Sequence, residues 1–372
     1  MKKQAPEYDA IFALLRNALW GVPIEREALA GITEETWKSV HAESLKQTVL
    51  GNVFDAVLTL PEDKMPSRDV RMTMLAFVSR MELYNEKAAA VSSDIARLYD
   101  DNDIRYFLLK GWAAAAAYPL PEHRMQGDID FYICGGRSED AQKLLFGPQA
   151  DIEADAERHY HGKYKGIEVE NHFGLTHSTL PLYSSFQDEL YSLMESEEPF
   201  VLEMNGYSVR STGPNFNVLF MLEHATFHLL AGIGLRHLCD WMRQLYFFRD
   251  RLDRSFLREI IYKYKFERIA NAFLLICIEH LGMDELLAPI DVKRNRKSRG
   301  DAEYVLKLII RGGNFGHHND LLHASQSHLH LNKTAKKVVS FFVMLRNYRK
   351  YRLISPTYFG DTFRDSIKRT LG

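Results

Sequence analysis

The feature that most constrains the fold is a change of sequence pattern between two long helical stretches. From Asp9 to about Asp100, apolar residues recur at three- and four-residue intervals, which is typical of amphipathic helices. Residues 96–210 contain instead short β-branched and aromatic runs separated by glycine turns, and helical periodicity returns from Pro214. This order predicts an α+β protein with a helical section at 1–95, an α/β domain at 96–210 and a helical domain at 211–372.

The middle section begins with a strand, a tight turn and a helix in succession. Residues 104–109 are a β-branched and aromatic run, Lys110-Gly111 can form the turn, and Trp112 with the five alanines after it favours a helix. Further along, the sequence predicts a strand at 129–133 and hairpins around Lys165-Gly166 and Asn205-Gly206. In the helical sections, residues 68–99 contain neither Gly nor Pro and predict one long helix or two abutting ones, whereas the polar segment 293–300 predicts a loop.

Composition narrows the functional classes. Hydrophobic residues make up 46% and charged residues 26% of the 372 positions, which is typical of a globular protein. The formal net charge of −2 gives the whole molecule no strong attraction to nucleic acid or membrane. Three separated cysteines, no apolar run of roughly 20 residues and no signal-peptide core lead us to expect a cytoplasmic protein that does not bind membranes.

Two aspartates carry the clearest chemical signal. Asp128 and Asp130 are two positions apart on a predicted strand, so their side chains point to the same face and repel each other unless a cation lies between them. Mg²⁺ or Mn²⁺ fits, because hard cations bind a few carboxylates together with substrate phosphates. A third acid is expected from the strand at 167–172, where Glu168, Glu170 and His172 share one face and either glutamate could be the ligand.

Phosphate-binding groups surround this pair in the sequence. Gly111 lets the backbone approach an anion at a predicted helix N-terminus, and Lys110 adds a positive charge beside it. Arg124 could place a forked guanidinium on phosphates, and Gly127 directly precedes the aspartates. We therefore expect Lys110, Gly111, Arg124 and Gly127 to bind a nucleotide.

Taken in order, these motifs resemble those of a known family. The motifs are Leu109-Lys-Gly111, Tyr118-Pro119, Arg124, Gly127-Asp-Ile-Asp130 and Glu170-Asn-His172, with a weaker similarity at Leu235–Asp240. They are similar to the bacterial uncharacterised nucleotidyltransferases of the DNA polymerase beta superfamily. The resemblance implies a nucleotidyltransferase fold with a small mixed sheet, metal ligation by Asp128 and Asp130, and Glu170 as the third ligand. That superfamily usually carries Gly-Ser or Gly-Gly where this chain has Lys110-Gly111-Trp112.

The predicted reaction moves a nucleoside monophosphate from an NTP such as ATP to an unknown acceptor, which could be a small molecule, a protein or RNA. Two metals held by Asp128, Asp130 and Glu170 would stabilise both the attacking and the leaving oxygen. An alternative is a catalytically inactive protein that keeps the fold and only binds or regulates. A second alternative is a metal phosphohydrolase built on His224, His228 and Asp240.

Two further charge patterns have simpler interpretations. Arg236 and Asp240 are four positions apart and predict an ion pair on a helix surface, although Arg236 could instead close over substrate. Basic stretches at 293–299 and 333–352 could hold an RNA backbone, but solvated surfaces are the default for such segments.

Overall fold

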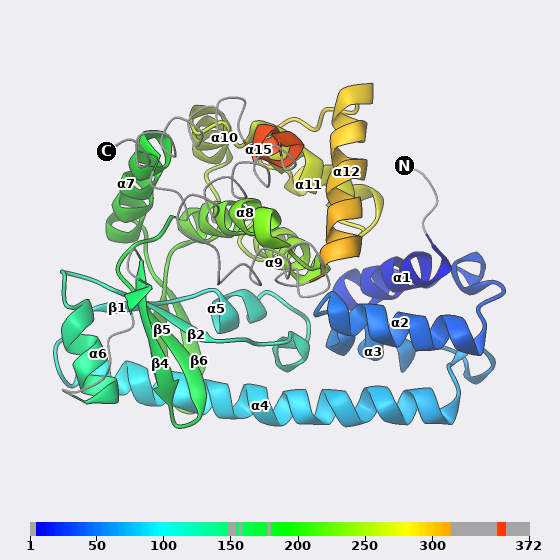
Figure 1. Cartoon of the computed structure of the whole chain (residues 1–372), viewed down its shortest axis with the longest axis horizontal. Helices are drawn as coiled ribbons and strands as arrows, with labels where there is room; N and C mark the ends of the chain where they lie inside the picture. Colours follow the sequence, from blue (N-terminus) through cyan, green and yellow to red (C-terminus); the bar gives the residue numbers. More distant parts are fainter. Residues whose placement is uncertain (1–4, 148–153, 156–157, 177–179, 314–347, 355–372) are drawn as a thin grey trace, which may run out of the picture.

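The computed structural model describes residues 5–147, 154–155, 158–176, 180–313 and 348–354. A seven-stranded mixed sheet lies beside a larger body of helices, which confirms the predicted α+β class (Figure 1). No helix in these ranges is long and apolar enough to cross a bilayer.

The N-terminal helices end in one unusually long helix. Helices α1 (Pro6–Trp20), α2 (Glu34–Lys46) and α3 (Leu50–Val57) precede α4 (Arg68–Asp100), which is a single helix of 33 residues and therefore about 50 Å long. The Ser67 side chain caps its start by accepting a hydrogen bond from the Val70 backbone N–H. Helix α4 contacts α2 and α3 near one end and the sheet near the other, so it connects the two parts of the molecule (Figure 1).

The sheet has the order β3-β4-β5-β2-β1-β7-β6. Strand β2 is antiparallel to β1 and parallel to β5, while β4–β5 and β6–β7 are antiparallel hairpins. The β6–β7 turn lies at Asn205-Gly206, as predicted, with φ values of +49° and +71°. The strands are β1 (Tyr106–Leu109), β2 (Ile129–Ile133), β3 (Ala154–Asp155), β4 (His159–Tyr164), β5 (Ile167–His172), β6 (Phe200–Met204) and β7 (Tyr207–Ser211).

The other described helices lie between the strands or after the sheet. They are α5 (Gly111–Ala115), α6 (Ser138–Phe146), α7 (Pro181–Ser196), α8 (Pro214–Ala231), α9 (Leu235–Phe247), α10 (Arg254–Lys263), α11 (Glu267–Glu279), α12 (Arg296–Gly312) and α15 (Tyr348–Ile354). Short 3₁₀ turns include η3 (Pro121–His123). The predicted loop at 293–300 is wrong beyond Asn295, because the Asn295 side chain accepts a 3.0 Å hydrogen bond from the Ser298 N–H and starts α12.

Two hydrophobic cores hold these parts together. The smaller core lies between the sheet, α6 and the end of α4, where Phe131 packs edge to face against Tyr99 and Tyr106. The larger core unites the first three helices with the C-terminal helices. Buried Gln47 shows this union, since its side chain donates to the Tyr8 hydroxyl and to the Ile309 carbonyl. The predicted boundaries at 95 and 210 stay a prediction.

Candidate functional site

Three carboxylates meet where β2 and β5 run side by side. The parallel register places Asp130 directly opposite Glu170, and Asp128 lies just before β2. One carboxylate oxygen from each of the three acids lies within 4.8 Å of the others. Glu168 lies outside this cluster, since its exposed side chain pairs with Lys163 at 3.0 Å. The structure therefore brings Glu170, and not Glu168, to the two aspartates.

A lysine and a histidine contact the acidic cluster. The Lys110 Nζ lies 2.7 Å from Asp130 Oδ1. The His172 Nε2 lies 2.8 Å from the same oxygen and 3.1 Å from Glu170 Oε2. Repulsion among the acids is thus partly compensated by residues of the chain itself.

The acids and cations shift one another's protonation. Burial alone would lower the pKa of Lys110, but the combined attraction of Asp130, Asp128 and Glu170 raises it. Burial also acts to lower the pKa of His172, and hydrogen bonds with Asp130 and Glu170 raise it above its ordinary value. Burial would raise the pKa of Glu170, yet the His172 hydrogen bond and the Lys110 charge lower it. These opposing effects favour an ionised Glu170 at neutral pH.

His159 on β4 completes the cluster and was missed by the sequence reasoning. Its Nε2 lies 3.4 Å from Glu170 Oε1, and His159, Glu170 and His172 form a second group whose ligand atoms lie within 4.8 Å of one another. A signal was present, because a two-residue hairpin turn at Lys165-Gly166 pairs position 159 with position 172. The site therefore offers nitrogen ligands beside its three carboxylates.

The predicted strand-turn-helix lies next to the acids. Lys110 and Gly111 have φ values of +45° and +35°, and the first of these is a conformation that non-glycine residues rarely adopt. Such strain costs about 1–3 kcal/mol and persists where the surroundings enforce it. Helix α5 has only five residues, so its dipole is small and the Lys110 ammonium is the main positive charge at this turn.

A cleft of about 220 Å³ lies over the cluster. Its sheet wall includes the predicted nucleotide-binding residues Lys110, Gly111, Arg124 and Gly127 together with the three acids. The opposite wall comes from α8 and α9 and includes Phe220, His224, His228, Arg236, His237 and Asp240. All the site residues predicted from the sequence therefore line one cavity.

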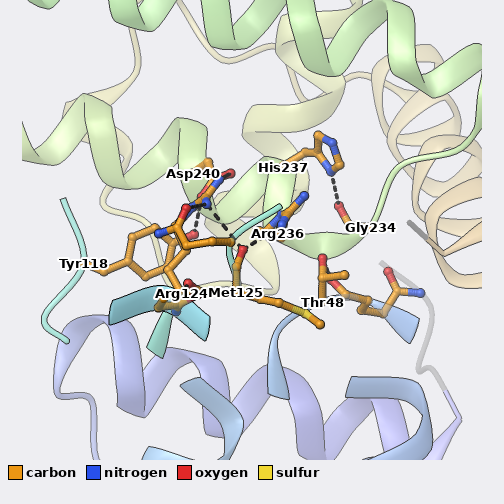
Figure 2. A network of polar contacts seen from close by, with 11 residues as sticks. Thr48, Tyr118, Arg124, Met125, Gly234, Arg236, His237 and Asp240 are labelled. Atoms are coloured by element: carbon orange, nitrogen blue, oxygen red, sulfur yellow. Dashed lines mark hydrogen bonds and ion pairs between the residues drawn. The ribbon is translucent and has the colours of Figure 1, made fainter. Parts of the chain in front are cut away.

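The Arg124 guanidinium binds Asp240 on the helical wall of the cleft, within a network of polar contacts (Figure 2). Its Nε and Nη2 bind the two oxygens of Asp240 at 2.8 and 2.7 Å, and the Tyr118 hydroxyl donates to Asp240 Oδ1 at 2.7 Å. Nη1 donates to Gln126 Oε1 at 2.9 Å. All three guanidinium nitrogens are thus occupied, and the predicted phosphate contact of Arg124 stays a prediction.

The pairing of Asp240 with Arg124 affects two predictions made from the sequence. The predicted surface ion pair between Arg236 and Asp240 is wrong, since Asp240 is 2% exposed and pairs with Arg124. Burial alone would raise the pKa of Asp240, but Arg124 lowers it. With both oxygens bound by Arg124, Asp240 is not available to form the metal site with His224 and His228 on which the phosphohydrolase alternative depends.

The basic segments show ordinary surface pairing where they are described. Arg294 forms a two-point ion pair with Glu285, and Arg299 pairs with Glu279. Residues 333–347 of the second basic stretch lie outside the described residues. Binding of RNA by either segment stays a prediction.

Comparison with known proteins identifies the family. A family model described as uncharacterised nucleotidyltransferase matches residues 33–282. No curated protein matches the chain. A solved structure, an antigenic nucleotidyltransferase-like protein from Paracoccidioides brasiliensis, is 13% identical and covers 53% of this chain and 93% of its own, with a TM-score of 0.30. Because the family model spans more than half of the sequence, this chain belongs to the family of uncharacterised nucleotidyltransferases.

Proposed function

We propose that this protein transfers a nucleoside monophosphate from an NTP to an acceptor nucleophile, using a divalent cation bound by Asp128, Asp130 and Glu170. One observation carries the proposal: in a member of a nucleotidyltransferase family, two carboxylates from the neighbouring strands β2 and β5 and a third just before β2 converge in a cleft. The sheet wall binds donor phosphates beside the cation, and the helical wall formed by α8 and α9 faces the substrates from the other side of the cleft. The class of acceptor and the bacterial and polymerase beta relationships stay predictions.

The donor atoms suit Mg²⁺ or Mn²⁺. Three carboxylates offer only oxygen, which is the ligand that hard cations prefer. When bound, the cation would neutralise charge on the phosphates and help align them with the nucleophile. The nearby imidazoles of His159 and His172 suit Mn²⁺ better than Mg²⁺, because nitrogen is a softer ligand.

Residues of the chain supply the other functions. The Lys110 ammonium contacts Asp130 and lines the cleft, so it lies within reach of a donor phosphate after a side-chain rotation. Gly127 lets a substrate approach the backbone beside Asp128, since a side chain there would project into open space. Glu170, whose pKa is lowered by His172 and Lys110 against the effect of burial, stays ionised and is therefore suited to bind the cation.

Transfer of label from NTPs tests the proposal. The purified protein is incubated with Mg²⁺ or Mn²⁺ and each α-³²P-labelled NTP, with and without a cell extract as the source of acceptor. We expect labelled product and pyrophosphate with one or more NTPs. Glu170→Gln should abolish the transfer, whereas Glu168→Gln, which changes an exposed acid on the same strand, should keep it.

Other results of this experiment point to the alternatives. NTP binding without transfer in any extract would favour the inactive binding protein. Equal transfer by wild type and Glu170→Gln would show that the acidic cluster is not the site. Release of inorganic phosphate without nucleotide transfer would favour a phosphohydrolase.

A further inference from the structure

Arg236 on α9 is an incompletely satisfied cation in the wall of the cleft. Its Nη1 donates a 2.7 Å hydrogen bond to the Met125 carbonyl (Figure 2). Its Nε is buried and has no hydrogen-bond partner, and no carboxylate pairs with this guanidinium in the described part of the chain. An arginine carries five N–H donors, so most of its capacity is unused.

Two neighbouring buried arginines, Arg124 and Arg243, have partners for their guanidinium groups. Arg124 has a two-point ion pair with Asp240 and a contact with Gln126. Arg243, two turns after Arg236 on α9, donates to the Ala117 and Leu19 carbonyls, and its guanidinium lies 4.6 Å from the centre of the Trp20 ring. Among the described residues, no acid forms an ion pair with Arg236 and no aromatic ring stacks on it. Of the two arginines on α9, Arg236 lines the cleft and Arg243 does not.

The surroundings of Arg236 favour binding of an anion. Burial lowers the pKa of Arg236 and the positive charge of Arg124 lowers it further, and together these effects outweigh the opposing attraction of Asp240 and Asp128, neither of which forms an ion pair with it. The charge of Asp240 is already engaged by Arg124. Burial and the nearby Arg236 lower the pKa of His237 to about 3, so that imidazole stays neutral and does not compete for an anion. A ligand with negative charge would relieve the unpaired guanidinium.

We propose that Arg236 binds a phosphate group of a substrate from the helical wall of the cleft. A phosphate matches the planar fork of a guanidinium, which binds two of its oxygens at once. This inference rests on the proposed function for the identity of the substrate, but the binding itself requires no turnover. The phosphate belongs either to the tail of the NTP donor or to a phosphorylated acceptor.

Titration calorimetry with unreactive probes tests the assignment. Wild type, Arg236→Gln and Arg236→Lys are titrated in Mg²⁺ with tripolyphosphate, with a non-hydrolysable NTP, and with inorganic phosphate after saturation with that NTP analogue. Arg236→Gln should lose roughly 10-fold or more in affinity for a phosphate probe, the size of a charge-assisted hydrogen bond. Arg236→Lys keeps the positive charge but lacks the forked guanidinium, so its affinity for the probe should lie between those of wild type and Arg236→Gln.

The probes distinguish the two sources of the phosphate. Weaker binding of tripolyphosphate and of the NTP analogue assigns Arg236 to the donor tail. Unchanged analogue binding with weaker binding of inorganic phosphate assigns it to the acceptor. Both results support an anion site even if no label transfer is found, which separates this inference from the proposed reaction.

Arg243→Gln is the matched control, since it removes a buried arginine from the same helix outside the cleft. It should bind all probes as wild type does. Equal losses in Arg243→Gln and Arg236→Gln would assign the effect to damage of α9 and overturn the proposal. Wild-type affinity for every probe in a folded Arg236→Gln, or in Arg236→Lys if the glutamine variant does not fold, would overturn it as well.

Discussion

The two walls of the cleft each contain an almost fully buried aspartate, but the groups that compensate its negative charge differ. Asp240 on the helical wall is 2% exposed and is bound by Arg124 at both oxygens and by Tyr118 at one. Asp130 on the sheet wall is 3% exposed and receives Lys110 and His172 on a single oxygen, beside Asp128 and Glu170. In the helical network of Arg124, Asp240 and Tyr118, both aspartate oxygens are bonded. In the acidic cluster of Asp128, Asp130 and Glu170, three carboxylates have one permanent cation, Lys110, paired with them.

This difference teaches that burial of a charge does not identify a functional site. A buried ion pair with all its partners is a structural element, and breaking it leaves an uncompensated charge. A buried cluster with excess charge of one sign is expensive to maintain without a ligand. The sheet wall is therefore the candidate for cation binding, and the unpaired Arg236 is its counterpart for anions.

The largest expected effect on stability comes from breaking the ion pair between Arg124 and Asp240 on the helical wall. Asp240→Asn should lower the free energy of unfolding by about 3–5 kcal/mol, because the buried Arg124 guanidinium loses its counterion. Urea unfolding of wild type and variant measures this. A loss below about 1 kcal/mol would show that the two walls do not differ as proposed.

The sheet wall should respond instead to added cation. Saturating Mn²⁺ or Mg²⁺ at about 100 times its dissociation constant should stabilise wild type by about 2.7 kcal/mol. Asp128→Asn should remove this gain while leaving the metal-free protein within about 1 kcal/mol of wild type, since no described side chain is bonded to Asp128. Thermal unfolding with and without the cation gives the comparison. Glu168→Gln should keep the full gain, and a gain that survives in Asp128→Asn would contradict the metal assignment.

The contacts of His123, which hold the segment that carries Arg124, should stabilise the fold less at alkaline pH. His123 lies just before Arg124, is hydrogen-bonded to Asp55, and contacts Glu82 at 2.9 Å. The Asp55 hydrogen bond, against the effect of burial and with help from Glu82, raises the pKa of His123 to about 9. The folded pKa is above the unfolded value of 6.5, so this stabilisation is fully present below pH 6.5 and is lost as the pH rises through about 9.

We expect the loss to be on the order of 2 kcal/mol, allowing for the solvent-screened Glu82. Denaturant unfolding of wild type and His123→Asn from pH 6 to pH 10 measures it. The variant should be less stable at pH 6 and should approach wild type at pH 10. Parallel curves for the two proteins would show that His123 does not hold this segment.

The fold class could be predicted because its signals are local. Asn205-Gly206 between two apolar runs encodes its hairpin directly, and residues 68–99 lack any helix breaker. The i, i+2 spacing of Asp128 and Asp130 likewise places both on one face of a strand. These features depend on neighbours within a few residues.

The rest depends on long-range pairing that a single sequence does not reveal. Glu168 and Glu170 share a face of β5, and only the parallel register with β2 brings Glu170 opposite Asp130. Arg236 lies one helical turn from Asp240, yet Arg124, 116 positions away, binds that carboxylate. Arg124 is the favoured partner of Asp240 because it forms two hydrogen bonds in a buried site, whereas a local ion pair on a helix surface contributes only a few tenths of a kcal/mol.

The smallest expected effect concerns Lys110, the cation that belongs to both the acidic cluster and the predicted phosphate site. Lys110→Ala should weaken binding of a non-hydrolysable NTP by roughly fivefold at low salt, or about 1 kcal/mol, because a point charge facing the cleft is lost. The difference should shrink at high ionic strength, where a partly exposed charge is screened. Lys163→Ala is the control, since Lys163 is an exposed lysine paired with Glu168 and lies outside the cleft lining. Identical affinities of wild type and Lys110→Ala at low salt would show that Lys110 serves only to hold Asp130, in which case the sheet wall, like the helical wall, would use its cation as a structural partner.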